Sequence, residues 1–468
     1  MRRGVVTFFL IALVVTAARL CHSNVLWADD NLPLAAAMQV ARGKVLYRDV
    51  WFDKPALVAW INLLWGARAG VPLRLAGAAY VIAASAVAWQ FARSKWTERE
   101  GLFAACFAAF FLTFGLPSAV IPLASDMLLV LPHLSAVYFA WRGRAFLSGL
   151  AAGIGLLCSS KAMFVLAACA LWQWRQWPLL LIGFLAPNAV VLSWMWLHGS
   201  AHEYYRQAWQ WGRIYAANTF VEHPFTEGVT RTANWIGFQA ALVIGAIAAL
   251  RRERRLAIWI SISFLGVILG LRFFPRYYFL LLPPMIVAAS RGWSLLAITP
   301  HVSAGIRRFV LLALCALLAV PFIRFGKPYV TLARGATMSD LAMDRDSRAA
   351  AQRLRALSRP GDTLFVWGFR PDIFIDSQLP AGTRFLESQP ISGVLADRHL
   401  FSSASIAPDF TAPNVRELLT TNPTWIVDGL ALYNPPLALQ RQPALAEWFS
   451  LYTEVARTDF SILYRQRP

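Results

Sequence analysis

Apolar residues fill long runs along the first two thirds of the chain, and short polar stretches separate these runs. Eleven runs stand out, at residues 5–20, 71–92, 101–116, 127–141, 145–159, 162–173, 177–197, 233–250, 256–271, 278–290 and 309–323. A helix needs roughly 20 apolar residues to cross a bilayer, and several of the runs are shorter than that. The pattern predicts a polytopic α-helical membrane protein with about eleven transmembrane helices.

The polar stretches between the runs indicate an orientation. With the N-terminus in the cytoplasm, the cytoplasmic connections contain MRR, RSKWTERE, RGR, WRQW, RRERR and SRGW…GIRR, and each is basic. This distribution follows the positive-inside rule. It places residues 21–70, 117–126, 198–232 and 272–278 outside, together with the C-terminal tail. The N-terminal run lacks a clear small-residue cleavage site, so we expect it to remain as the first span.

Composition agrees with a membrane protein. Hydrophobic residues make up 58% of the chain and charged residues only 15%, against about 25% charged residues in a typical soluble protein. The formal net charge is +19, but residues 345–468 contain 13 Arg, no Lys and 12 acids, so the excess lies in the membrane part. Membrane-flanking cations explain most of it, and no soluble basic face suggests nucleic-acid binding. The five cysteines lie in or beside apolar runs and read as buried small residues.

The chain changes character after Pro328. A helical pattern at 347–358 leads into the strand-like TLFVWGF. The segments that follow are DIFIDSQ, TRFLE, the helical NVRELLTT, the strand-like TWIVDG and a hairpin-like LYTEVARTDFSILYRQ. We therefore expect a transmembrane domain at 1–325, with outer loops 21–70 and 198–232, and a small extracytoplasmic α/β domain at 326–468. The tail has no glycine-rich phosphate loop, so a lid, an acceptor platform or a structural cap is its expected role.

The first outer loop begins with two adjacent acids. Residues 30–42, DNLPLAAAMQVAR, have the pattern of an amphipathic helix that Asp30 or Asn31 could cap and that Gly43 would follow. Capping needs one oxygen, whereas Asp29 and Asp30 supply two carboxylates beside a membrane surface. Repulsion between neighbouring carboxylates favours uptake of a proton, which suits a general base. Helix capping by Asp30 is the alternative interpretation.

Farther along the same loop, GKVLYRDVWFDKPALVAW contains a candidate anion site. Lys54 and Pro55 stand where another apolar helix is expected to begin, and a helix N-terminus favours negative charge. This combination predicts a phosphate site at Lys54. Both large outer loops retain several cations, although outer loops are usually poor in them. An anionic ligand or snorkelling of long side chains to the interface would explain these cations.

These motifs resemble the GT-C membrane glycosyltransferases, in the branch that contains protein O-mannosyltransferases and lipid A aminoarabinose transferases. The resemblance rests on the acid pair after the first span, G-x-x-L-Y-R-D, F-D-K-P, the glycine-rich segment 145–161 that ends in Lys, and RFFPRYYFLLLPP at 272–284. It implies a GT-C fold with a large first outer loop. It also implies an enzyme that takes a sugar from a polyprenyl-phosphate carrier.

The resemblance implies roles for individual residues. Asp29 matches the family's catalytic acid, and Asp30 stands where the family usually has Glu. Lys54 matches the Lys of the family's F-E-K-P-P segment, which contacts the carrier phosphate, although Ala replaces the second Pro. Arg213 matches an Arg that reaches the same phosphate, and His223 begins a segment similar to the family's H-x-P-F.

Further candidates lie near the expected outer ends of the spans. Arg276 and Lys161 would bind a phosphate or headgroup, or would snorkel. Asp126 begins a span and would lie near the acceptor or a metal, or would cap a helix. Tyr47 in the first loop is an auxiliary candidate near the acceptor, while a lone His133 in an apolar run reads as a core residue. No spacing matches a metal-ligand motif, so a divalent ion is not indicated, although relatives of this fold differ in metal use.

These features together predict a glycosyltransferase. It would move a sugar from a polyprenyl-phosphate donor to a lipid, glycan or protein hydroxyl, by inversion with an Asp base. The alternatives are a transporter or flippase of lipid-linked sugars, for which we find no internal repeat, and a non-catalytic envelope assembly protein. The Arg- and Ala-rich composition is compatible with a bacterial inner (plasma) membrane, with the N-terminus cytoplasmic and the C-terminal domain in the periplasm.

Overall fold

The structure, a computed structural model, describes residues 2–116, 118, 120–218, 221–297, 303–336, 338 and 341–467. Parts of the expected connections at 117–126, 198–232 and 290–308 therefore lie outside the described residues. Contacts divide the chain into two units. The first unit contains Met1–Ser23, Val71–Ser193 and Thr219–Ala336, and the second contains Asn24–Gly70, Trp194–Asn218 and Thr337–Pro468.

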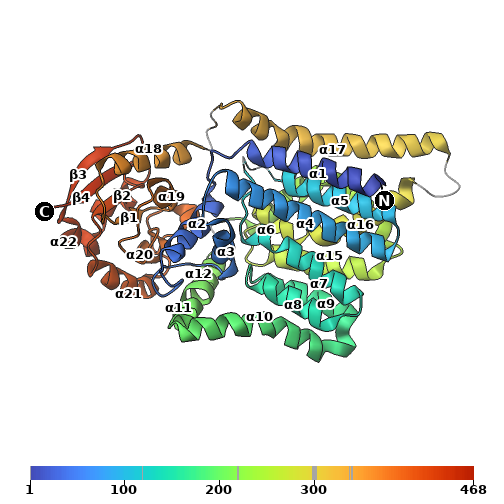
Figure 1. Ribbon diagram of the computed structural model, residues 1–468, viewed down its shortest axis with the longest axis horizontal. Coiled ribbons are helices and arrows are strands. Elements are labelled where there is room, and N and C mark those ends of the chain that lie inside the picture. The colour runs from blue at the N-terminus through green and yellow to red at the C-terminus, as the bar shows by residue number, and fades with distance from the viewer. Residues whose placement is uncertain are drawn as a thin grey trace. The chain divides into compact units, whose positions relative to one another are not determined.

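The first unit is built from apolar helices. Their bounds are α1 (Arg2–Leu20), α4 (Val71–Lys95), α5 (Glu98–Phe114), α6 (Ser125–Leu128), α7 (Val130–Trp141), α8 (Ala145–Leu156), α9 (Ala162–Gln173), η2 (Trp174–Gln176), α10 (Trp177–Leu197), α13 (Pro224–Phe238), α14 (Ala240–Leu250), α15 (Arg254–Ile268), η4 (Pro275–Leu280), α16 (Leu282–Ala297) and α17 (Ala304–Ala333). Each of the eleven apolar runs overlaps one of these helices, as predicted. Helices α1, α4, α5 and α16 lie side by side (Figure 1).

Helix length and apolarity single out fewer spans than the sequence pattern. Within the described residues, three helical stretches are long and apolar enough to cross a membrane: Val71–Lys95, Ala162–Leu197 and Ala304–Ala333. Helices α13 and α14 pass the same test together but are bent by 89°. The run at 233–250 is therefore not one straight helix, contrary to expectation. Gln239 lies at the break, where its buried side chain donates a hydrogen bond to the Gly115 carbonyl (Nε2–O 3.0 Å).

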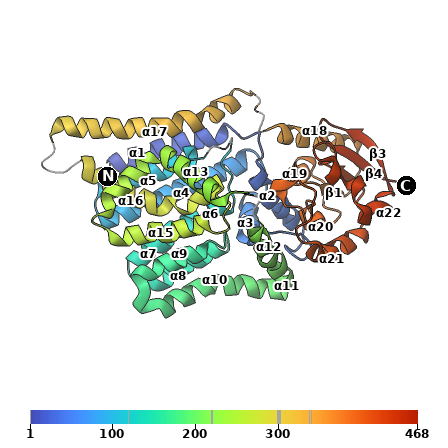
Figure 2. The same ribbon diagram turned by 180° about the vertical axis from the view of Figure 1, so that it is seen from behind.

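Glycines allow two of these helices to approach at backbone distance. A Cβ placed on Gly292 of α16 would lie 1.6 Å from the carbonyl oxygen of Gly245 on α14. Small residues are typical of interfaces between membrane helices because they let backbones meet. These two glycines therefore set the spacing of α14 and α16. Figure 2 shows α16 in one group of helices with α4 and α5.

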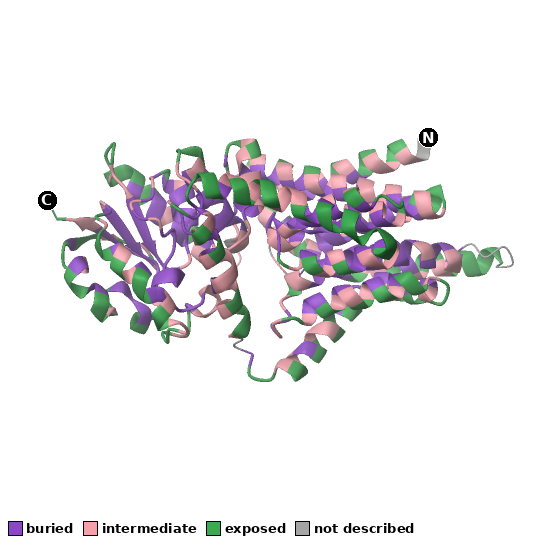
Figure 3. Cartoon of the chain, turned by 90° about the horizontal axis from the view of Figure 1, so that it is seen from below, coloured by how far each residue is buried: buried purple, intermediate pink, exposed green. Residues whose placement is uncertain are grey.

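The second unit is centred on a four-stranded mixed sheet of order β1-β2-β4-β3. Its strands are β1 (Leu364–Trp367), β2 (Trp425–Asp428), β3 (Tyr452–Arg457) and β4 (Ile462–Gln466). Strand β1 pairs in parallel with β2, starting with Leu364 opposite Trp425, and β4 pairs antiparallel with both β2 and β3. Strands β1 and β2 are buried along their whole length (Figure 3). The sequences LFVW and WIVD agree with this burial. A strand covered on both faces does not need apolar and polar residues to alternate along it.

Short helices complete the second unit. They are α2 (Ala28–Ala41), α3 (Leu57–Trp60), η1 (Ile61–Trp65), α11 (Ala201–Tyr204), the π-helix η3 (Tyr205–Gln210), α12 (Trp211–Ala217), α18 (Ala342–Leu357), α19 (Asp372–Ser377), α20 (Gln389–Ser392), η6 (Ala396–Arg398), α21 (Pro408–Leu419), η7 (Pro435–Leu437), η8 (Leu439–Arg441), η9 (Pro443–Leu445) and α22 (Ala446–Phe449). The helices expected at 347–358 and in NVRELLTT overlap α18 and α21. DIFIDSQ forms helix α19, and no described strand includes TRFLE.

The hydrophobic core of the second unit includes residues from both large loops. Trp51 from the first loop and Trp211 from the second are buried in one cluster with side chains of β1 and its neighbours. The Trp51 ring lies 6.1 Å from that of Phe385, and the Trp211 ring lies 5.4 Å from that of Phe410. Two indole side chains in one core bury a large apolar area. The loops that carry the candidate site are therefore held by the C-terminal segment.

Candidate active site

The acid pair lies in the first turn of α2. The helix starts at Ala28 with Trp27 as the N-cap residue and no side-chain cap hydrogen bond. Neither Asp30 nor Asn31 is the cap, which corrects the interpretation of Asp30 as a capping residue. Asp29 is half-buried and Asp30 is buried. Both carboxylates lie where the helix dipole stabilises negative charge, and Asp29 is the more accessible of the two.

Acids of the C-terminal segment hold the start of α2 in place. The Asp344 carboxylate accepts a hydrogen bond from the Leu26 amide (2.9 Å), and that of Asp372 accepts one from Asn31 Nδ2 (3.3 Å). The Asn31 side-chain oxygen in turn accepts from the amide of Leu32 (2.6 Å). Burial raises the pKa of Asp372, although Arg370 and three hydrogen bonds oppose this rise. The orientation of the acid pair thus depends on residues more than 300 positions away.

A strained turn at Tyr47 supports Lys54. Tyr47 is fully buried and has a φ of 69°, a region that non-glycine residues rarely adopt. Its amide donates to the Val50 carbonyl (2.8 Å), and its hydroxyl donates to the Lys54 carbonyl (2.7 Å). Gln207 clamps the same segment, since it donates to the Tyr47 carbonyl (2.8 Å) and accepts from the Phe52 amide (2.9 Å). Burial raises the pKa of Tyr47 well above its usual range, so its hydroxyl stays neutral and supports the chain rather than titrating.

Lys54 is paired with its neighbour. Its ammonium lies 3.0 Å from Asp53 Oδ1, and the Lys54 and Asp53 side chains are 26% and 14% exposed. Helix α3 begins only at Leu57 and has four residues, with Ala56 as its N-cap. Pro55 was expected to occupy the first turn of this helix, but it precedes the helix. An anion at this position would therefore bind the Lys54 ammonium and not the N-terminus of a long helix.

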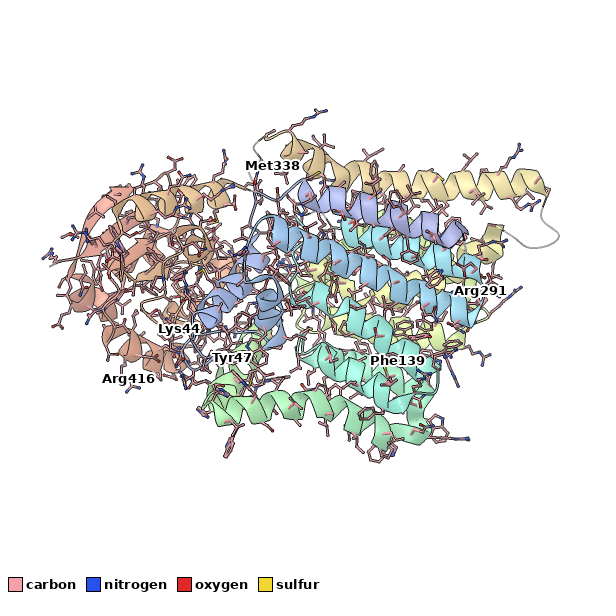
Figure 4. The ribbon with its side chains drawn as sticks, viewed as in Figure 1. Lys44, Tyr47, Phe139, Arg291, Met338 and Arg416 are labelled. Atoms are coloured by element: carbon pink, nitrogen blue, oxygen red, sulfur yellow. The ribbon has the colours of Figure 1, made fainter. Side chains whose placement is uncertain are left out.

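Several cations of the first loop bind backbone carbonyls. Arg42 donates to the Gln378 carbonyl (2.8 Å) and Lys44 to that of Ala381 (2.7 Å). Arg48 pairs with Asp49 and also donates to the His198 carbonyl (3.2 Å). Lys44 and Tyr47 can be found in Figure 4 on the segment that follows α2. These cations have partners within the second unit, so neither an anionic ligand nor snorkelling is needed to explain them.

Arg213 lies on α12, where it is exposed. Its guanidinium donates to the Tyr205 hydroxyl (3.1 Å). His223 is likewise exposed and precedes α13 in the first unit, as its N-cap residue without a side-chain cap bond. Both side chains are accessible to a ligand.

The first unit contains a second polar cluster. Lys161 Nζ lies 2.7 Å from Asp126 Oδ1 and 3.3 Å from the centroid of the Tyr277 ring, next to Arg276. Ala124, and not Asp126, is the N-cap residue of α6, so Asp126 serves as an ion-pair partner and not as a cap. Helix α6 packs against η4, which carries Arg276 and Tyr277. Three of the predicted residues, Asp126, Lys161 and Arg276, therefore gather in one place.

Two further expectations can be compared with the structure. His133 is buried, as expected for a core residue, and its Nε2 accepts a hydrogen bond from the Trp259 indole (2.8 Å). Among the residues that the structure describes, no group of three or more His, Cys, Asp or Glu side chains is placed to hold a metal ion.

Comparison with solved structures places the whole chain in a known architecture. ArnT from Cupriavidus metallidurans, solved with undecaprenyl phosphate, aligns with a TM-score of 0.62 and 15% identity over 98% of this chain and 97% of its own. The oligosaccharyltransferase AglB from Archaeoglobus fulgidus, solved with an inhibitory peptide and a dolichol-phosphate, aligns with a TM-score of 0.54 and 11% identity over 99% of this chain and 74% of its own. This is the GT-C fold.

Mycobacterial arabinofuranosyltransferase AftD shares the GT-C fold, with a TM-score of 0.54 and 15% identity over 99% of this chain and 41% of its own. No family model matches the sequence, and no curated protein matches it. The resemblance to GT-C enzymes noted from the motifs is thus confirmed at the level of the fold. The GT-C fold and the apolar helices make the chain a multi-pass α-helical membrane protein.

The structure also adds residues that sequence reasoning missed. Asp344 and Asp372 hold the start of α2, and Asp53 pairs with Lys54. Asp53 stood within the F-D-K-P motif, which was a usable signal. The others come from the tail, where no local pattern marks them.

Proposed function

We propose that the chain is a glycosyltransferase that uses a polyprenyl-phosphate-linked sugar as donor. The observation that carries this proposal is the alignment with ArnT bound to undecaprenyl phosphate, which covers nearly the full length of both chains. The acid pair and Lys54 support it, because they belong to the same unit and lie in the loop that the motif resemblance marked. The acceptor is a hydroxyl of an envelope lipid, glycan or protein.

In this mechanism Asp29 is the general base. It takes the proton of the acceptor hydroxyl while the hydroxyl oxygen attacks the anomeric carbon of the sugar. The bond from that carbon to the phosphate oxygen breaks, the phosphate leaves with the electron pair, and the configuration inverts. Asp29 is preferred over Asp30 because it is half-buried whereas Asp30 is buried. Asp30 lies buried in the same first turn of α2.

Lys54 and Arg213 are the proposed ligands of the leaving phosphate. Charge that builds on the leaving group is stabilised most by cations already in place. Lys54 is paired with Asp53, and the two side chains are only 26% and 14% exposed. A phosphate that binds Lys54 therefore competes with the Asp53 carboxylate for the ammonium.

The cluster in the first unit has a proposed role of its own. Lys161 and Arg276 are candidates for binding a phosphate or headgroup, and Asp126 for contacting the acceptor. His223 and Tyr47 are auxiliary candidates, with Tyr47 acting through its support of the Lys54 backbone. We also propose about eleven spans, a cytoplasmic N-terminus and an extracytoplasmic C-terminal domain in a bacterial inner membrane.

The experiment compares wild type, Asp29→Asn and Asp30→Asn in reconstituted membranes that contain polyprenyl-phosphate sugars and envelope acceptors. Asp29→Asn should lower the rate of sugar transfer by at least about 100-fold, since general-base catalysis contributes about 10²–10⁴-fold. Asp30→Asn should lower it much less. Donor binding by Asp29→Asn, measured separately, should remain unchanged.

Other outcomes would revise the proposal in defined ways. Loss of transfer at Asp30→Asn alone would move the base to Asp30. Movement of the lipid-linked sugar between leaflets by wild type, without transfer, would instead show a flippase.

A further inference from the structure

Two uncommon backbone conformations meet in the second unit, at a contact that the proposed mechanism does not use. Tyr47 has a φ of 69°. Non-glycine residues in this left-handed region are strained, and they cluster at active sites and ligand clamps. Helix η3 (Tyr205–Gln210) is a π-helix, a rare conformation that is frequent at functional sites. Gln207 of η3 donates a hydrogen bond to the Tyr47 carbonyl, so the two conformations belong to one arrangement.

Gln207 holds two points of the Tyr47 turn. Its side chain is fully buried. Its Nε2 donates to the Tyr47 carbonyl (2.8 Å), and its Oε1 accepts from the Phe52 amide (2.9 Å). Nε2 also donates to Glu203 Oε2 (2.9 Å). An ionised carboxylate only accepts hydrogen bonds, so Glu203 determines which end of the Gln207 amide faces the Tyr47 carbonyl. Both polar atoms of Gln207 therefore bond the backbone of the segment from Tyr47 to Phe52.

The Tyr47 turn holds the backbone of Lys54. The Tyr47 hydroxyl donates to the Lys54 carbonyl (2.7 Å). The Tyr47 ring is buried, and its centroid lies 4.9 Å from that of Tyr204 and 6.2 Å from that of Phe52. A ring that is packed on its sides keeps its hydroxyl in one place. A chain of contacts thus runs from Gln207 through Tyr47 to the backbone that carries the Lys54 side chain.

The position of the Lys54 ammonium depends on this backbone. A lysine side chain is a flexible stem that ends in a compact charge, so the side chain alone does not fix where that charge lies. The ammonium is paired with Asp53 (3.0 Å), and a phosphate must compete with that carboxylate. A backbone that is held before the ligand arrives lowers the entropy lost on binding. Groups that hold the Lys54 backbone therefore strengthen phosphate binding without contacting the phosphate.

We propose that Gln207 is a positioning residue for the phosphate site at Lys54, because it fixes the strained turn at Tyr47 that holds the Lys54 backbone. Gln207 acts through Tyr47 and does not touch the phosphate. The inference rests on the proposed function, since it takes Lys54 as a phosphate ligand. It adds η3 to that site, and η3 leads directly into α12, the helix that carries Arg213.

Binding of two lipids to the full-length protein in detergent tests this role. Undecaprenyl phosphate and undecaprenol have the same chain, and only the first has a phosphate. Gln207→Leu removes both bonds to the turn and should weaken binding of undecaprenyl phosphate about tenfold, which corresponds to one hydrogen bond of typical strength. It should leave binding of undecaprenol unchanged. In a Lys54→Met background, where the phosphate has no ammonium to meet, Gln207→Leu should have no further effect on either lipid.

Two further variants accompany this comparison. Gln210→Leu is the matched control, since Gln210 lies in the same π-helix but is only half-buried, and it should leave binding of both lipids unchanged. Tyr47→Phe covers the case in which Gln207→Leu does not fold, because it removes one oxygen and keeps the buried ring. It should weaken binding of undecaprenyl phosphate about three- to tenfold, for the loss of one hydrogen bond, and leave that of undecaprenol unchanged.

Three results would overturn the inference. One is wild-type affinity for undecaprenyl phosphate in Gln207→Leu or in Tyr47→Phe. Another is an equal loss of affinity for both lipids, which would show a purely structural role. The third is a further loss when Gln207→Leu is added to Lys54→Met. In each case the proposed function would stand as long as wild type binds undecaprenyl phosphate and Lys54→Met alone binds it more weakly. If wild type fails to bind undecaprenyl phosphate, the proposed function itself fails.

Discussion

Single carboxyl groups in the second unit are strongly affected by burial. Asp376 on α19 is half-buried, and burial together with the charges of Asp372 and Asp344 raises its pKa to about 7, while Arg348 and Arg355 act in the opposite direction. In the unfolded chain an Asp titrates near pH 4. As pH rises from about 4 to 7, the unfolded state therefore loses its proton first, and the free energy of unfolding falls. Ionised Asp376 destabilises the fold that holds the acid pair.

Asp376→Asn removes this penalty. The variant should be more stable than wild type by about 1–3 kcal/mol at pH 8 and by much less at pH 4.5. Thermal unfolding of the full chain at the two pH values measures the difference. Asp409→Asn changes an exposed acid on α21 and should shift stability little at either pH. An equal gain at both pH values in Asp376→Asn would contradict the assignment.

At the scale of elements, close approach of helices decides stability in the first unit. Gly292 of α16 meets the backbone of α14 at Gly245. Around a Cβ added to Gly237 of α13, the described residues place no heavy atom within 4 Å, apart from its chain neighbours and its own helix backbone. The same substitution therefore has opposite consequences at the two glycines. An added methyl group must displace a backbone at the first and meets open space at the second.

Gly292→Ala should destabilise the protein by about 1–3 kcal/mol, the usual cost of overpacking. Gly237→Ala should leave stability unchanged or raise it by up to about 1 kcal/mol, because alanine favours the helix. Thermal unfolding in detergent distinguishes the two. Similar melting temperatures for both variants would mean that α14 and α16 do not pack at Gly292.

At the scale of the whole molecule, one arginine joins three separate parts of the sequence. Arg384 lies 2.5 Å from Glu203 and 3.3 Å from Glu417, donates to the Tyr47 carbonyl (3.0 Å), and stands over the Trp51 ring. Burial tends to raise the pKa of Glu203, but hydrogen bonds from Arg384 and Gln207 outweigh it and hold the pKa below its usual value. The stabilisation by this pair is therefore lost as pH falls through the lowered pKa.

Arg384→Met should destabilise the second unit by about 1–3 kcal/mol, because the partly buried Glu203 loses its nearer cation and keeps only Arg206, 3.8 Å away. Limited proteolysis should then cut within residues 24–70 faster than in wild type. Arg416→Met is the matched control, since Arg416 is exposed on α21 (Figure 4), and it should leave the cleavage pattern unchanged. Equal protection of the loop in both variants would show that Arg384 does not tie it down.

The sequence by itself determined where the membrane helices lie, and it marked the acid pair and Lys54. Helix positions follow from unbroken apolar runs, which are a local property. The end of α2 at Gly43, with a φ of 91°, was also visible, because glycine is favoured where the backbone turns left-handed after a helix. Asp29, Asp30 and Lys54 were predicted as site residues because they stand in short motifs.

Only the tertiary structure decided what surrounds these residues. The Gln239 side chain at the bend bonds to the Gly115 carbonyl, and the start of α2 depends on Asp344 and Asp372. Each of these contacts joins residues more than 100 positions apart. Local patterns record which residues avoid water, but they do not record which distant segments meet, because that is settled by packing of the whole chain.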